Sequence, residues 1–125
     1  MRKILIVDDT PIVLEGTALA VESLGFSVET AINGLAAIEL FKSGSFAAIL
    51  MDCNMPKMNG FECTKQIRLL ERETNSHVPI IGYSSNSDSN IREQCLAAGM
   101  DDFVSKECSS NKLSNTLRQW ASEIS

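Results

Sequence analysis

The chain has 125 residues, of which 44% are hydrophobic and 22% charged. This length and balance predict one domain over residues 1–125 with a hydrophobic core of its own, and they exclude a disordered tail. The formal charge of −5 argues against direct nucleic-acid binding, which needs clustered basic residues, and the lack of an apolar run of about 20 residues argues against membrane insertion.

In chain order, short apolar segments of strand length alternate with longer segments of helical periodicity. The predicted strands are Ile4–Val7, Ser27–Ala31, Ala47–Met51, Pro79–Tyr83 and Phe103–Val104. The predicted helices present these apolar faces: Val13, Thr17, Ala20, Val21 and Leu24; Ala37, Ile38 and Phe41; Cys63, Ile67 and Leu70; Ile91, Cys95 and Ala98; and Leu113, Leu117, Trp120 and Ile124. A strand followed by a helix, repeated five times, is the resulting order.

Residues at the ends of the helical segments agree with that order. Thr10 followed by Pro11 is typical of a helix N-cap and first turn, and Gly25 and Gly99 stand where helix C-caps are expected. The strand sequences ILIV and AAILM are apolar without alternation, which indicates strands covered on both faces. We therefore predict an α/β, flavodoxin-like doubly wound (βα)5 sandwich with a five-stranded parallel sheet of order 2-1-3-4-5.

Polar side chains stand at the ends of four of these strands. Asp8 and Asp9 follow the first strand, and Asp52 follows the third. Ser84 ends the fourth strand and Lys106 follows the fifth. Ligands of doubly wound sheets bind outside the carboxyl ends of the strands, where the strand order reverses. We therefore expect these side chains to converge at one edge of the sheet.

The types of these residues favour phosphoryl transfer. Two unit charges 4 Å apart repel by about 4 kcal/mol at an effective dielectric constant of 20, so three nearby carboxylates need a counter-charge. Mg²⁺ fits, because it binds carboxylate oxygens and keeps waters for a phosphate. A carboxylate can attack phosphorus to form an acyl phosphate, with Lys106 and the Ser84 hydroxyl placed to hold phosphoryl oxygens.

Each residue also has an ordinary structural explanation when it is taken alone. Asp8 and Asp9 suit a polar strand-to-helix turn, and an isolated Lys106 is a solvated charge. Phe103 is explained by core packing, and His77 lies in a polar segment that predicts a surface position. Their convergence at one sheet edge is what favours chemistry there.

The four cysteines, Cys53, Cys63, Cys95 and Cys108, show no CxxC spacing. A domain of this size needs no disulfides, so we interpret them as reduced thiols in or near the core. The segment MRKILIVDD reaches acidic residues too early for a secretory signal, which predicts a cytoplasmic location.

The segments IVDD, MDCNMPKMNG, the Ser84–Ser85 pair and FVSK together resemble the receiver domain of two-component response regulators, over essentially the whole chain. The resemblance implies that Asp52 is the phosphoacceptor. It also implies that Asp8, Asp9, Asp52 and the backbone carbonyl of Asn54 bind Mg²⁺. In the same way, Ser84 and Phe103 match the family's two switch positions, and Lys106 matches its invariant lysine.

The resemblance further implies partners and a signalling role. A histidine kinase or a histidine phosphotransfer protein would donate the phosphoryl group to Asp52, with self-catalysed phosphorylation and autodephosphorylation instead of conventional turnover. A downstream protein would bind the fourth helix, fifth strand and fifth helix. The segment MDCNMPKMNGFE is most similar to receivers of hybrid sensor histidine kinases, so the domain would be cytoplasmic either by itself or as part of a membrane-anchored kinase.

Three positions depart from the family pattern. Glu107 replaces the proline that usually follows the lysine, which predicts either a trans Lys106–Glu107 bond with an altered loop or a strained cis bond. Phe103 lacks the hydroxyl of a tyrosine. Gly82 and Tyr83 replace a small and an aliphatic residue, and we expect them to loosen or reshape the fourth strand.

Three other functions are compatible with parts of this sequence pattern. A Mg²⁺-dependent aspartyl-phosphate phosphatase carries a DxD motif on its first strand, whereas this chain has adjacent aspartates there, and turnover of small phosphate esters would separate the two. A phosphorylation-independent docking module would not need the full set of acids, hydroxyl and lysine. A flavin binder would need a loop rich in Ser, Thr and Gly after the first strand, where this chain has two acids.

Overall fold

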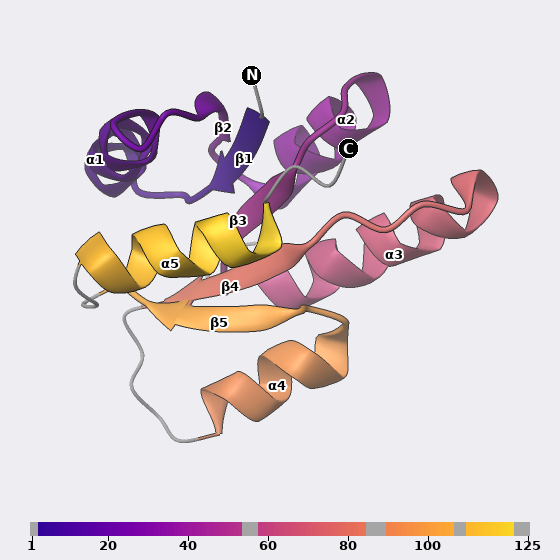
Figure 1. Ribbon diagram of the computed structural model, residues 1–125. Helices are drawn as coiled ribbons and strands as arrows, with labels where there is room; N and C mark the ends of the chain where they lie inside the picture. The colour runs from indigo at the N-terminus through magenta and orange to yellow at the C-terminus, as the bar shows by residue number, and fades with distance from the viewer. Residues whose placement is uncertain (1–2, 54–57, 85–89, 107–109, 122–125) are drawn as a thin grey trace.

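The computed structural model describes residues 3–53, 58–84, 90–106 and 110–121, in which strands and helices alternate (Figure 1). The elements are β1 (Lys3–Val7), α1 (Pro11–Glu22), β2 (Ser27–Ala31), α2 (Gly34–Ser43), β3 (Ala48–Asp52), α3 (Gly60–Thr74), β4 (Ile80–Ser84), α4 (Ile91–Ala98), β5 (Asp102–Ser105) and α5 (Ser110–Trp120). The predicted order is confirmed, and each predicted strand boundary lies within one residue of the observed one. Predictions for Asn54, Glu107, Cys108 and Ile124 lie outside the described residues.

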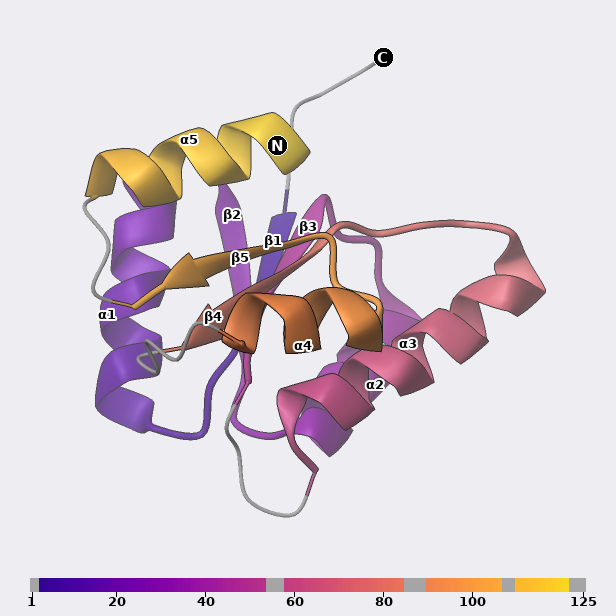
Figure 2. The same cartoon turned by 90° about the horizontal axis from the view of Figure 1, so that it is seen from below.

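The strands form one parallel sheet of order β2-β1-β3-β4-β5, as predicted. Helices α1 and α5 cover one face of the sheet, and α2, α3 and α4 cover the other (Figure 2). The strand order reverses between β1 and β3, which pair with Val7 opposite Met51. The carboxyl ends of these two central strands therefore lie next to each other.

Alternate residues of the central strands belong to the two hydrophobic layers. In β1, Leu5 packs with the α2–α3–α4 layer and Ile6 with the α1–α5 layer. In β3, Ile49 and Leu50 divide in the same way, and all four side chains are at most 1% exposed. Burying one such side chain contributes about 1.5–3 kcal/mol. The unbroken apolar runs therefore reflect a sheet that is covered on both faces.

Helix ends follow the predicted signals with two corrections. Thr10 is the N-cap of α1 and Pro11 its first residue, but the Thr10 side chain makes no capping hydrogen bond. Gly99 is the C-cap of α4, with φ of 109° that suits glycine. The C-cap of α1 is Ser23 and not Gly25, because the helix ends two residues earlier and Gly25 takes the positive φ of the following turn.

The predicted inner face of α1 was partly wrong. Thr17 and Val21 are buried as predicted, but the third fully inward position is Leu14, and Ala20 is exposed. This helix is apolar nearly all round, so its sequence does not distinguish the inner face from the outer one.

Strand β4 is a continuous buried strand that pairs with β3 and β5, so the expected loosening at Gly82 and Tyr83 is wrong. A Cβ atom on Gly82 would lie 2.7 Å from the Sγ of Cys95 and 2.9 Å from the Sδ of Met100. The glycine therefore makes room for neighbouring side chains without interrupting the strand.

The cysteines in the described residues, Cys53, Cys63 and Cys95, are free and buried, as predicted. Burial raises the pKa of Cys63 to about 12, which keeps its thiol protonated at neutral pH. Within the described part of the chain, no helix has the length and apolar character needed to cross a membrane.

Candidate functional site

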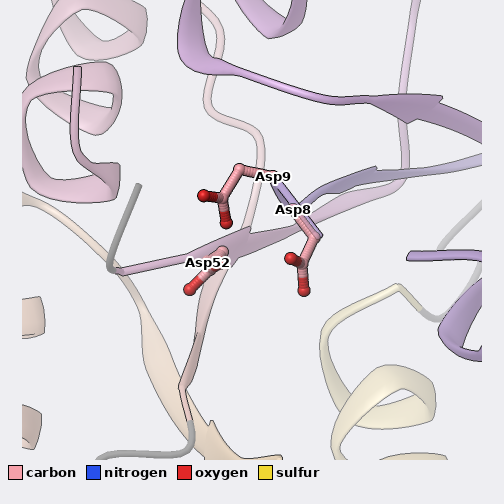
Figure 3. A group of neighbouring side chains, drawn as sticks. All are labelled: Asp8, Asp9 and Asp52. Atoms are coloured by element: carbon pink, nitrogen blue, oxygen red, sulfur yellow. The ribbon is translucent and has the colours of Figure 1, made fainter. Parts of the chain in front are cut away.

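Three carboxylates meet where β1 and β3 end (Figure 3). Asp52 is the last residue of β3, and Asp8 and Asp9 directly follow β1. Because the register places Val7 opposite Met51, the next residues on the two strands come side by side. One oxygen from each carboxylate lies within 4.8 Å of the others, as the sequence predicted for this edge of the sheet.

Two of these three carboxylates are nearly inaccessible. Asp8 is 1% exposed and Asp52 is 3% exposed, whereas Asp9 is half-buried. A buried ionised carboxylate is costly unless a counter-charge compensates for lost hydration. The site therefore depends on positive charge close to Asp8 and Asp52.

Lys106, which directly follows the carboxyl end of β5, supplies that charge. Its Nζ lies 2.8 Å from Oδ2 of Asp8 and 3.4 Å from Oδ2 of Asp52. Burial lowers the pKa of Lys106, but the ion pairs with Asp8 and Asp52 outweigh burial and hold the pKa above its ordinary value. The same ammonium lies 5.7 Å from the ring centre of Tyr83, a cation–π distance.

Backbone hydrogen bonds position these side chains. The Asp8 N–H donates to the Ala31 carbonyl at 3.1 Å, and the Thr10 N–H donates to Oδ1 of Asp8 at 2.9 Å. The Lys106 N–H donates to the Ser84 carbonyl at 2.8 Å. The sheet ladder thus continues past the strand ends and holds Asp8 and Lys106 on hydrogen-bonded backbone.

Gly60, the first residue of α3, was not among the predicted site residues. A Cβ atom at this position would lie 2.2 Å from the backbone oxygen of Asp52, and the Gly60 N–H donates to the Cys53 carbonyl at 3.2 Å. Only glycine allows α3 to begin so close to β3. The signal in the sequence was the final glycine of MDCNMPKMNG.

Ser84 and Phe103 occupy neighbouring strands beside the carboxylates. Ser84 is 1% exposed and ends β4, which pairs with β3. Phe103, on β5, is half-buried and packs against the α2–α3–α4 layer, with its Cδ1 3.3 Å from where a Cβ on Gly82 would lie. Asn54, the remaining predicted ligand, lies outside the described residues.

Asp102 is a second residue that sequence reasoning missed. Its carboxylate accepts hydrogen bonds from the Trp120 Nε1–H at 2.9 Å and from the Phe103 N–H at 2.8 Å, and it pairs with Arg92 at 3.1 Å. Burial alone would raise the pKa of Asp102, but these hydrogen bonds and the Arg92 charge lower it below its ordinary value. One carboxylate thereby links α4, β5 and α5.

Comparison with known proteins gives a consistent assignment. Residues 4–118 match the family model of the response regulator receiver domain. The chain is 36% identical to the hybrid signal transduction protein dokA of Dictyostelium discoideum over 119 residues, which are 95% of this chain and 7% of that protein. It thus spans only a small part of this relative's length.

Two solved structures are also similar. The receiver domain of the sensor histidine kinase PA1611 from Pseudomonas aeruginosa, with magnesium coordinated in its active-site cleft, is 33% identical, with 98% of each chain covered and a TM-score of 0.87. A co-crystal structure of the Saccharomyces cerevisiae phosphotransfer protein Ypd1 with the receiver domain of Ssk1 matches at 25% identity and a TM-score of 0.88, covering 96% of this chain and 88% of the matched one.

Proposed function

Because this chain belongs to the response regulator receiver domain family, we propose that Asp52 accepts a phosphoryl group from phosphohistidine in a Mg²⁺-dependent reaction. The observation that carries the proposal is the burial of Asp52 beside two further aspartates and a lysine ammonium. This arrangement places a nucleophilic oxygen, acidic metal ligands and a fixed positive charge at one sheet edge.

Each residue has a specific task in this proposal. An oxygen of Asp52 attacks phosphorus as the bond to the donor nitrogen breaks, which leaves an acyl phosphate on Asp52. The carboxylates of Asp8, Asp9 and Asp52 would hold Mg²⁺, together with the Asn54 carbonyl that the family pattern supplies. The metal supplies neutralisation of negative charge on the phosphoryl oxygens. Lys106 binds a phosphoryl oxygen from the β5 side.

The donor is proposed to be a histidine kinase or a histidine phosphotransfer protein. Exposed apolar side chains flank the acid cluster on its α1 and α2 side: Ile12 is 84% exposed, Ile32 58% and Leu35 61%. They follow the carboxyl ends of β1 and β2, at the same end of the sheet as Asp9. A donor that buried them would bring its phosphohistidine to the strand edge where Asp52 lies, and apolar contact of this kind suits a protein partner.

The output is proposed to be a changed protein-binding face on α4, β5 and α5. A phosphoryl group on Asp52 offers acceptor oxygens that draw the Ser84 hydroxyl toward β3, and Phe103 on the next strand, which already lies beside Gly82, then rotates into the space that Ser84 vacates. The Asp102 contacts with Arg92 and Trp120 transmit a movement of β5 to both helices.

Intact-mass measurement with a small acyl phosphate tests the chemistry. We expect one added phosphoryl group in the presence of Mg²⁺, and none with chelator or in Asp52→Asn. Glu39→Gln, an exposed change on α2, serves as the control and should label at the parent rate. Unchanged labelling of Asp52→Asn would disprove the assignment. Steady hydrolysis of phosphate esters would favour a phosphatase, and no labelling at all would favour a docking module.

A further inference from the structure

Two cysteine thiols lie in contact behind the candidate site. The Sγ atoms of Cys53 and Cys95 are 3.5 Å apart, although the residues are 42 positions apart in the chain. Both residues are 0% exposed. Cys53 directly follows Asp52 at the end of β3, and Cys95 lies in α4. The pair thus joins the strand that carries the proposed phosphoacceptor to a helix of the proposed output face.

The surroundings keep these two sulfur atoms together. A Cβ on Gly82 would lie 2.7 Å from the Sγ of Cys95, so the bare backbone of β4 is what lets α4 bring this thiol inward. The Sδ of Met100 borders the same space, at 2.9 Å from that Cβ position, and a methionine side chain adapts to small shifts. Closing the gap to a sulfur–sulfur bond of about 2.05 Å needs a movement of roughly 1.5 Å. Side-chain rotation and a slight approach of α4 supply movements of this size.

We propose that Cys53 and Cys95 are a redox modification site that forms a reversible disulfide when the protein meets a small peroxide. Hydrogen peroxide oxidises one thiol to a sulfenic acid and releases one water. The second thiol then attacks that sulfur, the sulfur–oxygen bond breaks, and the oxygen leaves as a second water with the thiol proton. Each sulfur loses one electron and each peroxide oxygen gains one. The peroxide reaches the buried sulfurs when α4, a helix of eight residues, separates transiently from the sheet.

The disulfide would fasten α4 to β3 and close a long loop in the chain. Closing such a loop restricts the unfolded state, so the oxidised protein should unfold at a temperature roughly 5–15 °C higher. Slower amide hydrogen exchange should be concentrated in α4. Neither effect depends on phosphorylation of Asp52, so this proposal can fail while the proposed function stands, and the reverse also holds.

The test is peroxide treatment of the full chain and of its Cys108→Ser variant, followed by intact-mass and peptide analysis. We expect loss of two hydrogen masses, a peptide pair linked through Cys53 and Cys95, and full reversal by a dithiol reductant. Cys95→Ala should abolish the change. Cys63→Ala is the matched control and should leave it intact, because the Sγ of Cys63 lies 3.6 Å from the Gly34 carbonyl oxygen and contacts no second thiol among the residues that the structure describes.

Three results would overturn the proposal. One is oxygen added to Cys53 or Cys95 without a cross-link, and another is a cross-link found only through Cys108. The third is an unchanged mass under conditions in which the urea-unfolded chain forms disulfides. Because the parent chain itself is mapped, a variant that fails to fold does not leave the proposal undecided.

Discussion

Charge compensation differs among the three aspartates of the site. Lys106 lies within ion-pair distance of Asp8 and Asp52, but no basic group in the described residues lies that close to Asp9. Asp9 is also less buried than the other two. Without metal, the Asp9 carboxylate repels the other two carboxylates, and no ion pair in the described residues offsets this repulsion. A site arranged in this way exchanges stability for metal binding.

Asp9→Asn should therefore stabilise the protein in chelator while weakening Mg²⁺ binding. We expect a thermal midpoint a few degrees higher, which corresponds to about 1 kcal/mol of removed repulsion. Asp8→Asn should show no such gain, because the carboxylate that it removes is paired with Lys106. Thermal melts in chelator and Mg²⁺ titrations of both variants measure this. A lower midpoint for Asp9→Asn would show that repulsion is not the dominant effect.

Two glycines at helix positions should respond to alanine in opposite directions. Gly60→Ala places a Cβ against the Asp52 backbone oxygen, so we expect a loss of about 2–4 kcal/mol in unfolding free energy and slower phosphorylation. Gly16→Ala, inside α1, where the new Cβ meets no atom within 4 Å apart from its chain neighbours and the backbone of its own helix, should gain about 0.5–1 kcal/mol. Urea unfolding measures both. Equal effects at the two positions would contradict the packing explanation for Gly60.

At the scale of elements, polar contacts at β-strand ends hold the helices in place. Arg68 of α3 donates to the carbonyls of Gly99 and Val78, both at 2.9 Å, and pairs with Asp101 at 2.8 Å. It thereby connects α3 to the segments that lead into β4 and β5. Sequence periodicity did not identify Arg68 or Asp102, because their partners are distant in the chain and hydrophobic patterns carry no information about polar pairs.

The Asp102 contacts predict a pH-dependent contribution to stability. Because the pKa of Asp102 is lowered in the folded protein, the contribution is present above the ordinary carboxyl pKa of about 3.9 and is lost as the pH falls through the lower, folded value. Asp102→Asn should therefore melt at a lower temperature than the parent at pH 7, and the difference should shrink below about pH 4. Melts of both proteins from pH 3 to 7 measure it. A constant difference would mean that the charge of Asp102 contributes nothing.

At the scale of the molecule, the strand order and the site edge were predictable from local patterns. Strand segments without polar–apolar alternation indicated a parallel sheet with helices on both faces. The common strand order of such sheets then placed Asp8, Asp9 and Asp52 together. The inner face of α1 was not predictable, because apolar side chains of α1 itself lie on nearly all sides of the helix. The need for glycine at position 60 arises from a backbone contact between β3 and α3, which no single segment contains.

The signalling proposal predicts that a change at Asp52 reaches the single tryptophan of the chain. Trp120 donates its indole N–H to the Asp102 carboxylate, which also accepts the Phe103 backbone N–H, so a repacking of Phe103 that moves β5 would alter the surroundings of the indole N–H. With Mg²⁺ and beryllofluoride, a phosphoryl mimic, we expect the indole N–H resonance to shift. Amide shifts should extend to four residues of the α4–β5–α5 face, namely Ile91, Arg92, Val104 and Lys112.

The matched control for this experiment is Asp52→Asn, in which the same additions should leave the Trp120 resonance in place. Phe103 has no hydroxyl, so neither of its positions gains or loses a hydrogen bond, and the apolar contact beside Gly82 is available before phosphorylation. We therefore expect the parent to populate the inward position in part already, and the shifts to be smaller than those of Phe103→Tyr. Shifts confined to the segments around Asp9 and Asp52, with Trp120 unmoved, would show that the signal leaves through another face.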